Sequence, residues 1–171
     1  MLVLGIDPGT ATTGFGLIKD KDGVMEVVNW GLIETDKESL LGKRFINIYS
    51  QVSKLIKEFK PDVVAMEKIF FATNAKTAIS VGQAQGVMIY CFAKSNLEVF
   101  EYAPGTIKKV VAGDGKAKKK DIQRSLRTIF GSKIRSAKKK KSHFDDSADA
   151  LAVALCHILS SKYKKGGEKN V

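Results

Sequence analysis

The sequence predicts one α/β domain in which three strands come first and two further strands then alternate with helices. Short runs of β-branched and apolar residues, separated by turn residues, occupy the N-terminal part of the chain. From residue 41 onward, apolar residues recur at helical spacing, and two later apolar runs are short enough to be buried strands. The length of 171 residues, of which 44% are hydrophobic, suits a single domain that buries its own core.

The first three strands are expected to form an antiparallel meander. Residues 2–7 are an apolar run that ends at Pro8-Gly9-Thr10. Two β-rich runs at 13–19 and 24–33 flank Asp22-Gly23, and an Asp-Gly pair in this position is typical of a tight hairpin.

The later elements follow from apolar spacing and from helix breakers. Apolar residues three and four apart between Leu41 and Phe59 indicate a helix that ends before Pro61. The elements after it are expected in this order: a buried strand at 62–67, a helix at 74–94, a strand at 97–102, helices at 104–111 and 119–130, a basic loop at 132–142 and a helix at 145–163. Residues 164–171 are a polar segment that we expect to fray, so the predicted domain comprises residues 1–163.

Positive charge is concentrated in one segment. The chain has 29 Lys and Arg against 18 Asp and Glu, a net charge of +11, and residues 108–141 alone contain fourteen basic and two acidic residues. Such a local field attracts polyanions, and no apolar stripe accompanies the lysines to favour a membrane surface. We therefore expect a nucleic acid as the partner.

Neither a membrane span nor a secretion signal is recognisable. No apolar run approaches the length of a membrane helix, and the N-terminus has no basic segment followed by a long apolar one. Cys91 and Cys156 lie in apolar helical patterns, which suits buried thiols in a reducing compartment. A cytoplasmic protein without a membrane partner is expected.

Two carboxylates close apolar runs. Asp7 follows the first strand and Glu67 ends the strand at 62–67. If these strands are neighbours, both side chains stand at one edge of the sheet, where ligand sites in α/β folds gather. Like charges placed together repel, and a divalent cation relieves that repulsion. The alternative for Asp7 is a purely turn-forming role before Pro-Gly.

A second acidic cluster opens the last helix. Asp146 and Asp149 are three residues apart, so their side chains share one helix face. Capping and the helix dipole explain an acid at 145 or 146, but they explain Asp149 poorly, because a long apolar run follows it directly. We therefore favour a site here.

The four carboxylates come from three distant segments and lack a Cys or His cluster. Oxygen donors of this kind suit Mg²⁺, with Mn²⁺ as a substitute, rather than structural zinc. With a nucleic acid as partner, they indicate phosphodiester hydrolysis by two metal ions. His143 borders the cluster and is a candidate supporting donor, whereas His157 lies among apolar residues and is expected to be packed or at the surface.

Other candidate contacts to DNA are aromatic or basic. Phe70 and Phe71 follow Glu67, and one of them should project near the site, where it would stack on an unpaired base. Core packing is the default for Phe71. The candidate phosphate contacts are Lys108, Lys116, Lys119, Lys138, Lys139, Lys140 and Lys141. A solvated surface position remains the alternative for each lysine.

Five blocks of this sequence together resemble one family. They are GIDPGTATTGFG at 5–16, AMEKIFF at 65–71, NAKTAISVGQAQGVMIY at 74–90, YAPGTIKKVVAGDGKAKKKDIQ at 102–123 and DDSADALAVALCH at 145–157. In this order they are similar to the RuvC-type crossover junction endodeoxyribonucleases, the bacterial Holliday junction resolvases. The chain departs from the family pattern mainly at residues 132–144, which are rich in lysine here.

The resemblance implies a ribonuclease H-like fold, with a central mixed five-stranded sheet and helices on both faces. It also implies a homodimer that resolves four-way DNA junctions by symmetric paired nicks in recombination and repair, with branch-migration helicases as partners. By motif, the catalytic, metal-binding quartet falls on Asp7, Glu67, Asp146 and Asp149, with two Mg²⁺ ions per site. The junction-contacting aromatic falls on Phe70, the two important lysines fall on Lys108 and Lys119, and residues 82–86 match the dimer helix.

Three alternatives remain from the residues alone. A related ribonuclease H-like nuclease would act on RNA or on an RNA-DNA hybrid, because carboxylate chemistry does not select the substrate. An actin-like ATPase also begins with a phosphate loop, but that fold repeats the domain and needs a much longer chain. A purely structural DNA-binding protein would explain the basic segment and leave the carboxylates without a role.

Overall fold

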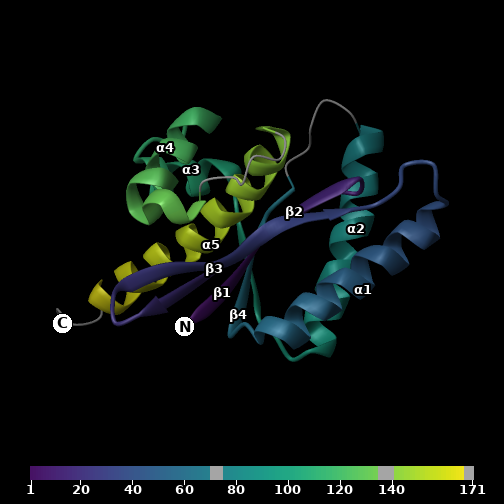
Figure 1. The fold of residues 1–171 in the computed structure, drawn as a ribbon, viewed down its shortest axis with the longest axis horizontal. Helices are drawn as coiled ribbons and strands as arrows, with labels where there is room; N and C mark the ends of the chain where they lie inside the picture. The colour runs from purple at the N-terminus through teal and green to yellow at the C-terminus, as the bar shows by residue number, and fades with distance from the viewer. Residues whose placement is uncertain (70–74, 135–140, 168–171) are drawn as a thin grey trace.

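A computed structural model describes residues 1–69, 75–134 and 141–167 (Figure 1). The strands are β1 Leu2–Asp7, β2 Thr12–Lys21, β3 Val24–Glu34, β4 Val63–Glu67 and β5 Val99–Tyr102. The helices are α1 Leu41–Phe59, α2 Ala75–Lys94, α3 Pro104–Ala112, α4 Lys119–Phe130 and α5 Lys141–Gly167, with a short 3₁₀ helix at Gly131–Ile134. The α/β class and the order of elements agree with the sequence pattern.

The strands form one mixed sheet in the order β3-β2-β1-β4-β5. β1 pairs antiparallel with β2, and β2 pairs antiparallel with β3. The hairpin between β2 and β3 turns at Asp22 and Gly23, both of which have positive φ. β4 lies parallel to β1 and β5 lies parallel to β4, so β1, β4 and β5 end at the same edge of the sheet. The five-stranded mixed sheet expected from the family resemblance is confirmed.

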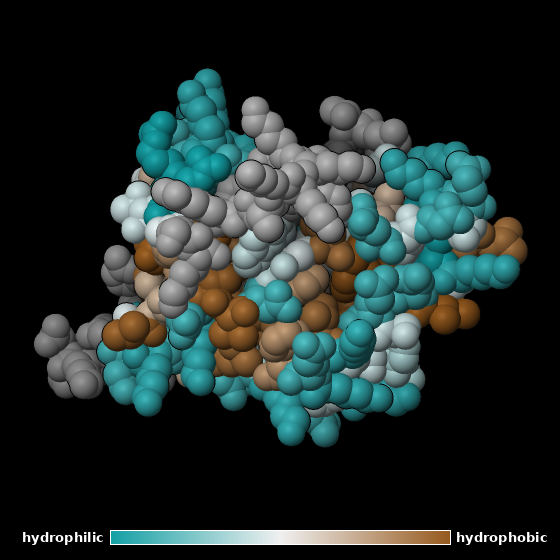
Figure 2. All heavy atoms as spheres, in the orientation of Figure 1, coloured by the Kyte–Doolittle hydropathy of each residue, from teal (hydrophilic) through white to brown (hydrophobic). Residues whose placement is uncertain are grey.

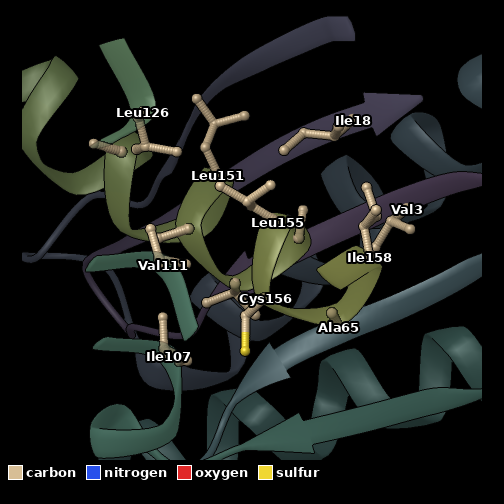
Figure 3. Close-up of a cluster of buried hydrophobic side chains, with 14 of the residues drawn as sticks. Val3, Ile18, Ala65, Ile107, Val111, Leu126, Leu151, Leu155, Cys156 and Ile158 are labelled. Carbon is tan, nitrogen blue, oxygen red and sulfur yellow. The ribbon is translucent and has the colours of Figure 1, made fainter. Parts of the chain in front are cut away.

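Helices cover both faces of this sheet. Alternate residues of β1 point to opposite sides, so Leu4 and Ile6 pack with α1 and α2, whereas Val3 packs with α5. Figure 3 shows the second core, in which Leu151, Leu155 and Ile158 of α5 lie between the sheet and the side chains of α3 and α4. α5 is therefore an inner helix, buried between two layers.

α5 rests on the sheet at two glycines. Gly5 of β1 and Gly16 of β2 are paired across the sheet. A Cβ added at Gly5 would lie 2.1 Å from the carbonyl oxygen of Ala150, and one added at Gly16 would lie 2.8 Å from side-chain carbons of Leu151. Atoms cannot approach so closely, so only glycine permits this contact.

The structure corrects the expected ends of the last helix. The apolar pattern predicts a helix over 145–163 after a basic loop at 132–142, whereas α5 extends from Lys141 to Gly167 and residues 131–134 are a 3₁₀ turn. The extra helical residues carry no apolar periodicity, so the pattern could not mark them. Among the described residues, no helix is both long and apolar enough to cross a membrane.

Candidate active site

The carboxyl ends of β1 and β4 bring Asp7 and Glu67 together. Ile6 pairs with Met66 in the parallel register, so the next residue of each strand is one of the two acids. Strand alternation directs both toward the face that α5 covers. Asp7 and Glu67 line one hollow of about 250 Å³, together with Pro8 and residues of α2.

α5 adds Asp149 to this edge. Glu67 and Asp149 line a second hollow, which also contains Lys108 of α3 and Lys119 of α4. The neighbours of Asp149 on α5, Ala148 and Ala150, are fully buried, while Asp149 keeps partial exposure toward the hollow. The glycine contact between β1 and α5 thus holds Asp149 beside Glu67.

Burial and charge perturb Glu67. Burial raises the pKa of this carboxyl, the negative charge of Asp149 raises it further, and the positive charge of Lys108 partly offsets both. The site therefore carries more negative charge than its surroundings can easily solvate. A bound cation would stabilise the ionised form of Glu67.

Lys119 partly neutralises the site. Its Nζ lies 2.9 Å from Oδ2 of Asp149, and the side chains of the two residues are 45% and 30% exposed. Pairs with this exposure contribute at most about 1 kcal/mol to stability. Lys119 is therefore a partly exposed cation at the site.

The donor set fits a hard cation. Asp7, Glu67 and Asp149 offer only oxygen atoms, which Mg²⁺ and Mn²⁺ prefer. In the part of the chain that the structure describes, no three acidic, His or Cys side chains form a ready-made cluster around one ion. The carboxylates instead line adjoining hollows that meet at Glu67.

Several predicted site residues lie outside the described part of the molecule. These are Phe70, Lys138, Lys139 and Lys140, together with the side chains of Lys141, His143 and Asp146. The backbone of Asp146 is in α5, one turn before Asp149. Lys116 is exposed in the turn between α3 and α4, where its N–H donates to Asp114, and it lines neither hollow.

The described part of the basic segment flanks the site on the side of Asp149. It includes most of α3, all of α4 and the 3₁₀ helix, and Lys108 and Lys119 are its basic residues that line the second hollow. Figure 2 shows hydrophilic side chains over α4, at the upper left of the molecule. The positive charge recognised in the sequence thus lies beside the carboxylates.

A hydrogen-bonded pair supports the end of β5. Tyr102 pairs with Glu67 across β4 and β5, and its hydroxyl lies 2.8 Å from Nδ1 of the buried His157. Burial raises the pKa of Tyr102 to about 12, with a further contribution from Cys156. His157 is thus a packed residue that joins α5 to β5, one of the two roles expected for it.

Sequence reasoning missed a third hollow beyond Asp7. It is lined by Asp7, the loop at residues 9–12, and the basic residues Lys37, Arg44 and Lys76. These three cations come from separate segments, and none belongs to a long basic run, so no sequence signal marked them. Only the fold brings them together.

Comparison with known proteins gives a consistent result. The sequence model of the family described as "Crossover junction endodeoxyribonuclease RuvC" matches residues 3–157. Proteins of that name from Caldicellulosiruptor saccharolyticus and Petrotoga mobilis are 44% identical over 163 residues and 43% identical over 157 residues. These matches cover 94% of both chains in the first case, and 92% of this chain and 93% of the relative in the second.

Solved structures share the fold. The structure described as "T. thermophilus RuvC in complex with Holliday junction substrate" superposes with a TM-score of 0.85 at 28% identity, covering 96% of each chain. The yeast mitochondrial Holliday junction resolvase Ydc2 superposes with a TM-score of 0.71 at 16% identity, covering 99% of this chain and 84% of the other. The second likeness concerns the fold alone.

Proposed function

The chain belongs to the RuvC family of crossover junction endodeoxyribonucleases, and from this we propose that it is a metal-dependent endonuclease that resolves four-way DNA junctions. The observation that carries the proposal is the gathering of Asp7, Glu67 and Asp149 at one sheet edge, with Lys108 and Lys119 beside them. Acidic groups that hold cations and basic groups that hold phosphates are the two needs of phosphodiester hydrolysis.

The carboxylates have the role of metal ligands. Asp7, Glu67 and Asp149 would hold divalent cations, and the family resemblance adds Asp146. Two Mg²⁺ ions per site, with Mn²⁺ as a substitute, would supply an activated water and stabilise the leaving oxygen. Glu67 must be ionised to bind a cation, and the positive charge of Lys108 favours the ionised form.

The lysines have the role of binding the backbone of the cut strand. Lys119 pairs with Asp149 in the structure, and a DNA phosphate offers it an alternative anion. Lys108 lies in the same hollow. Their charges offset the repulsion between an acidic site and a polyanionic substrate. By resemblance, Phe70 is proposed to stack on an unpaired base at the junction centre.

A homodimer would place two such sites on one junction. α2 contains the segment that resembles the family's dimer helix, and it exposes Ile79, Ile89 and Tyr90, with exposed fractions of 65%, 38% and 62%. Gly82 and Gly86 on the same helix have no atom within 4 Å of an added Cβ, so a second helix could approach closely there. Paired sites would produce symmetric nicks in the cytoplasm, downstream of branch-migration helicases.

A nicking assay tests the proposal against its alternatives. Synthetic four-way junctions, RNA-DNA hybrid duplexes and linear duplexes are incubated with parent or Asp7→Asn protein in Mg²⁺, Mn²⁺ or Ca²⁺. We expect paired nicks on the junction with Mg²⁺ or Mn²⁺, and a loss of at least about a hundredfold for Asp7→Asn, because several kcal/mol of transition-state stabilisation depend on the bound ions.

Preferential cutting of the hybrid would favour the ribonuclease H-like alternative. Undiminished cutting by Asp7→Asn would remove the carboxylates from the chemistry. Junction binding without any nicking would support a structural DNA-binding protein.

A further inference from the structure

The hollow beyond Asp7 is lined mainly by positively charged and hydroxyl-bearing side chains. It has a volume of about 590 Å³, and its charged lining consists of Lys37, Arg44 and Lys76 against the single acid Asp7. Hydroxyl groups of Thr10 and Ser80 also line it. Ammonium, guanidinium and hydroxyl donors around one space are suited to an anion with several oxygen atoms.

The wall of this hollow is fixed by hydrogen bonds. Arg44 Nε donates to Thr35 Oγ1 at 3.0 Å, and Thr35 Oγ1 donates to the carbonyl oxygen of Thr10 at 2.7 Å. Thr10 Oγ1 and Ser80 Oγ lie 2.9 Å apart. Thr10 and Thr35 are both buried, so these bonds join the loop after β1 to the end of β3, to α1 and to α2.

Asp36, the acid that precedes Lys37, forms a turn of its own. Its carboxylate accepts hydrogen bonds from the Glu38 N–H at 3.0 Å and from the Ser39 hydroxyl at 2.9 Å. These bonds lower the pKa of Asp36, and the positive charge of Arg44 lowers it further, so Asp36 offsets part of the charge of Arg44. Lys37 is exposed and lines the hollow.

The three hollows adjoin one another in a row, which is called the groove below. The hollow with Lys37 shares Asp7, Thr77 and Val81 with the hollow that contains Glu67. That hollow in turn shares Glu67 and Pro104 with the one that contains Asp149. The groove thus has carboxylates in its middle, Lys108 and Lys119 at one end, and Lys37, Arg44 and Lys76 at the other.

We propose that Lys37, Arg44 and Lys76 bind a backbone phosphate of the DNA strand that is cut, on the opposite side of Asp7 from Lys108 and Lys119. A strand lying in the groove is then held at both ends, and the phosphodiester between them is placed over the carboxylates. Holding the reacting group in place converts binding energy into rate. This inference rests on the proposed function, because it takes the groove to be the path of the cut strand.

Salt dependence of binding tests the contact directly. Junction binding by Lys37→Gln/Lys76→Gln is measured over a KCl series with Ca²⁺ or EDTA, so that no cutting occurs. Each phosphate contact contributes about 0.7 to 0.9 to the slope of log affinity against log salt. For a homodimer with two such sites, we expect the slope to fall by about 1.4 to 3.6, depending on whether one or both lysines of each protomer contact phosphates. Both side chains are exposed, so the variant should fold normally, as circular dichroism would show.

A matched control removes the same charge elsewhere. Lys54→Gln/Lys57→Gln alters α1 itself, and these residues lie about 15 and 20 Å along the helix from Arg44, at 1.5 Å per residue. They line a separate surface outside the groove. We expect this variant to keep the parental slope. Equal slopes for the two double variants would overturn the proposed contact.

Nicking by the parent protein distinguishes a failure of the phosphate site from a failure of the proposed nuclease function. If the parent cuts junctions but Lys37→Gln/Lys76→Gln has the parental slope, the phosphate site is wrong and the proposed function stands. If the slope falls as expected but the parent never nicks DNA in Mg²⁺ or Mn²⁺, the phosphate site stands and the nuclease proposal is wrong.

Discussion

The two faces of the sheet hold their helices in different ways. Toward α1 and α2, large side chains such as Ile48, Met88 and Phe92 stand between helix and strand. Toward α5, Gly5 and Gly16 bring the strand backbone into direct contact with the helix. Side chains can readjust around a small change, whereas backbone in contact cannot. One face therefore contributes mainly stability, and the other also fixes the position of Asp149 relative to Glu67.

The largest effect is expected from Asp149 of α5. Asp149→Asn removes a charged oxygen donor, and we expect the nicking rate to fall by about a hundred- to thousandfold, equivalent to about 3–4 kcal/mol. Its ion pair with Lys119 is partly exposed, so the free energy of unfolding should change by less than about 1 kcal/mol. Single-turnover nicking and thermal unfolding check the two values. A variant that cuts at the parental rate would place α5 outside the chemistry.

A somewhat smaller effect is expected from the glycine contact itself. In Gly5→Ala, the new Cβ would lie 2.1 Å from the Ala150 carbonyl oxygen, so α5 must shift. Overpacking of this kind costs about 1–3 kcal/mol of stability. A displacement of about 1 Å at a catalytic group lowers a rate by about a hundredfold. We expect such a loss per folded molecule, measured by nicking at a temperature where the variant is fully folded.

Ile48→Ala is the matched control on the other face. Ile48 is fully buried in α1, and its truncation should cost about 2–5 kcal/mol of stability. Because α1 carries Arg44 but none of the carboxylates, the folded fraction should cut at a rate much closer to the parental rate than that of Gly5→Ala. Equal losses of rate per folded molecule in Ile48→Ala and Gly5→Ala would show that the two faces do not differ as described.

The smallest predicted effect is an increase in stability, whereas the preceding variants are expected to lose activity or stability. Burial and Asp149 raise the pKa of Glu67, so its ionised form disfavours folding at pH values above its unfolded pKa. Glu67→Gln should therefore raise the melting temperature of the metal-free protein at neutral pH. The gain should disappear as the pH falls through the range in which the parent carboxyl gains its proton. Unfolding in EDTA across this pH range tests the sign, and a lower melting temperature at neutral pH would contradict it.

The sequence predicted the features that depend on local pattern. Asp7 and Glu67 each end an apolar run, and parallel pairing of those runs sufficed to bring them together. Asp149 was recognisable because an acid directly before a long apolar helical run needs an explanation. The helix at Lys119–Phe130 was predicted from the helical spacing of its apolar residues.

Features that depend on contacts between distant segments were not predictable. Gly5 and Gly16 look like weak strand residues until α5 is placed on them. Lys37, Arg44 and Lys76 look like ordinary surface charges in the sequence until the fold gathers them around the loop after β1. The placement of Phe70, and of the side chains of Asp146 and His143, stays a prediction.

The contact between Gly5 and α5 also determines when the protein can become active during synthesis. β1 leaves the ribosome before α5, which follows all the other described helices and strands. Until α5 emerges and docks, the nascent chain has Asp7 and Glu67 but lacks Asp149, and its glycines face solvent. Folding of such non-local contacts must wait for the later segment. A chain that stalls before α5 is therefore expected to be unable to cut DNA.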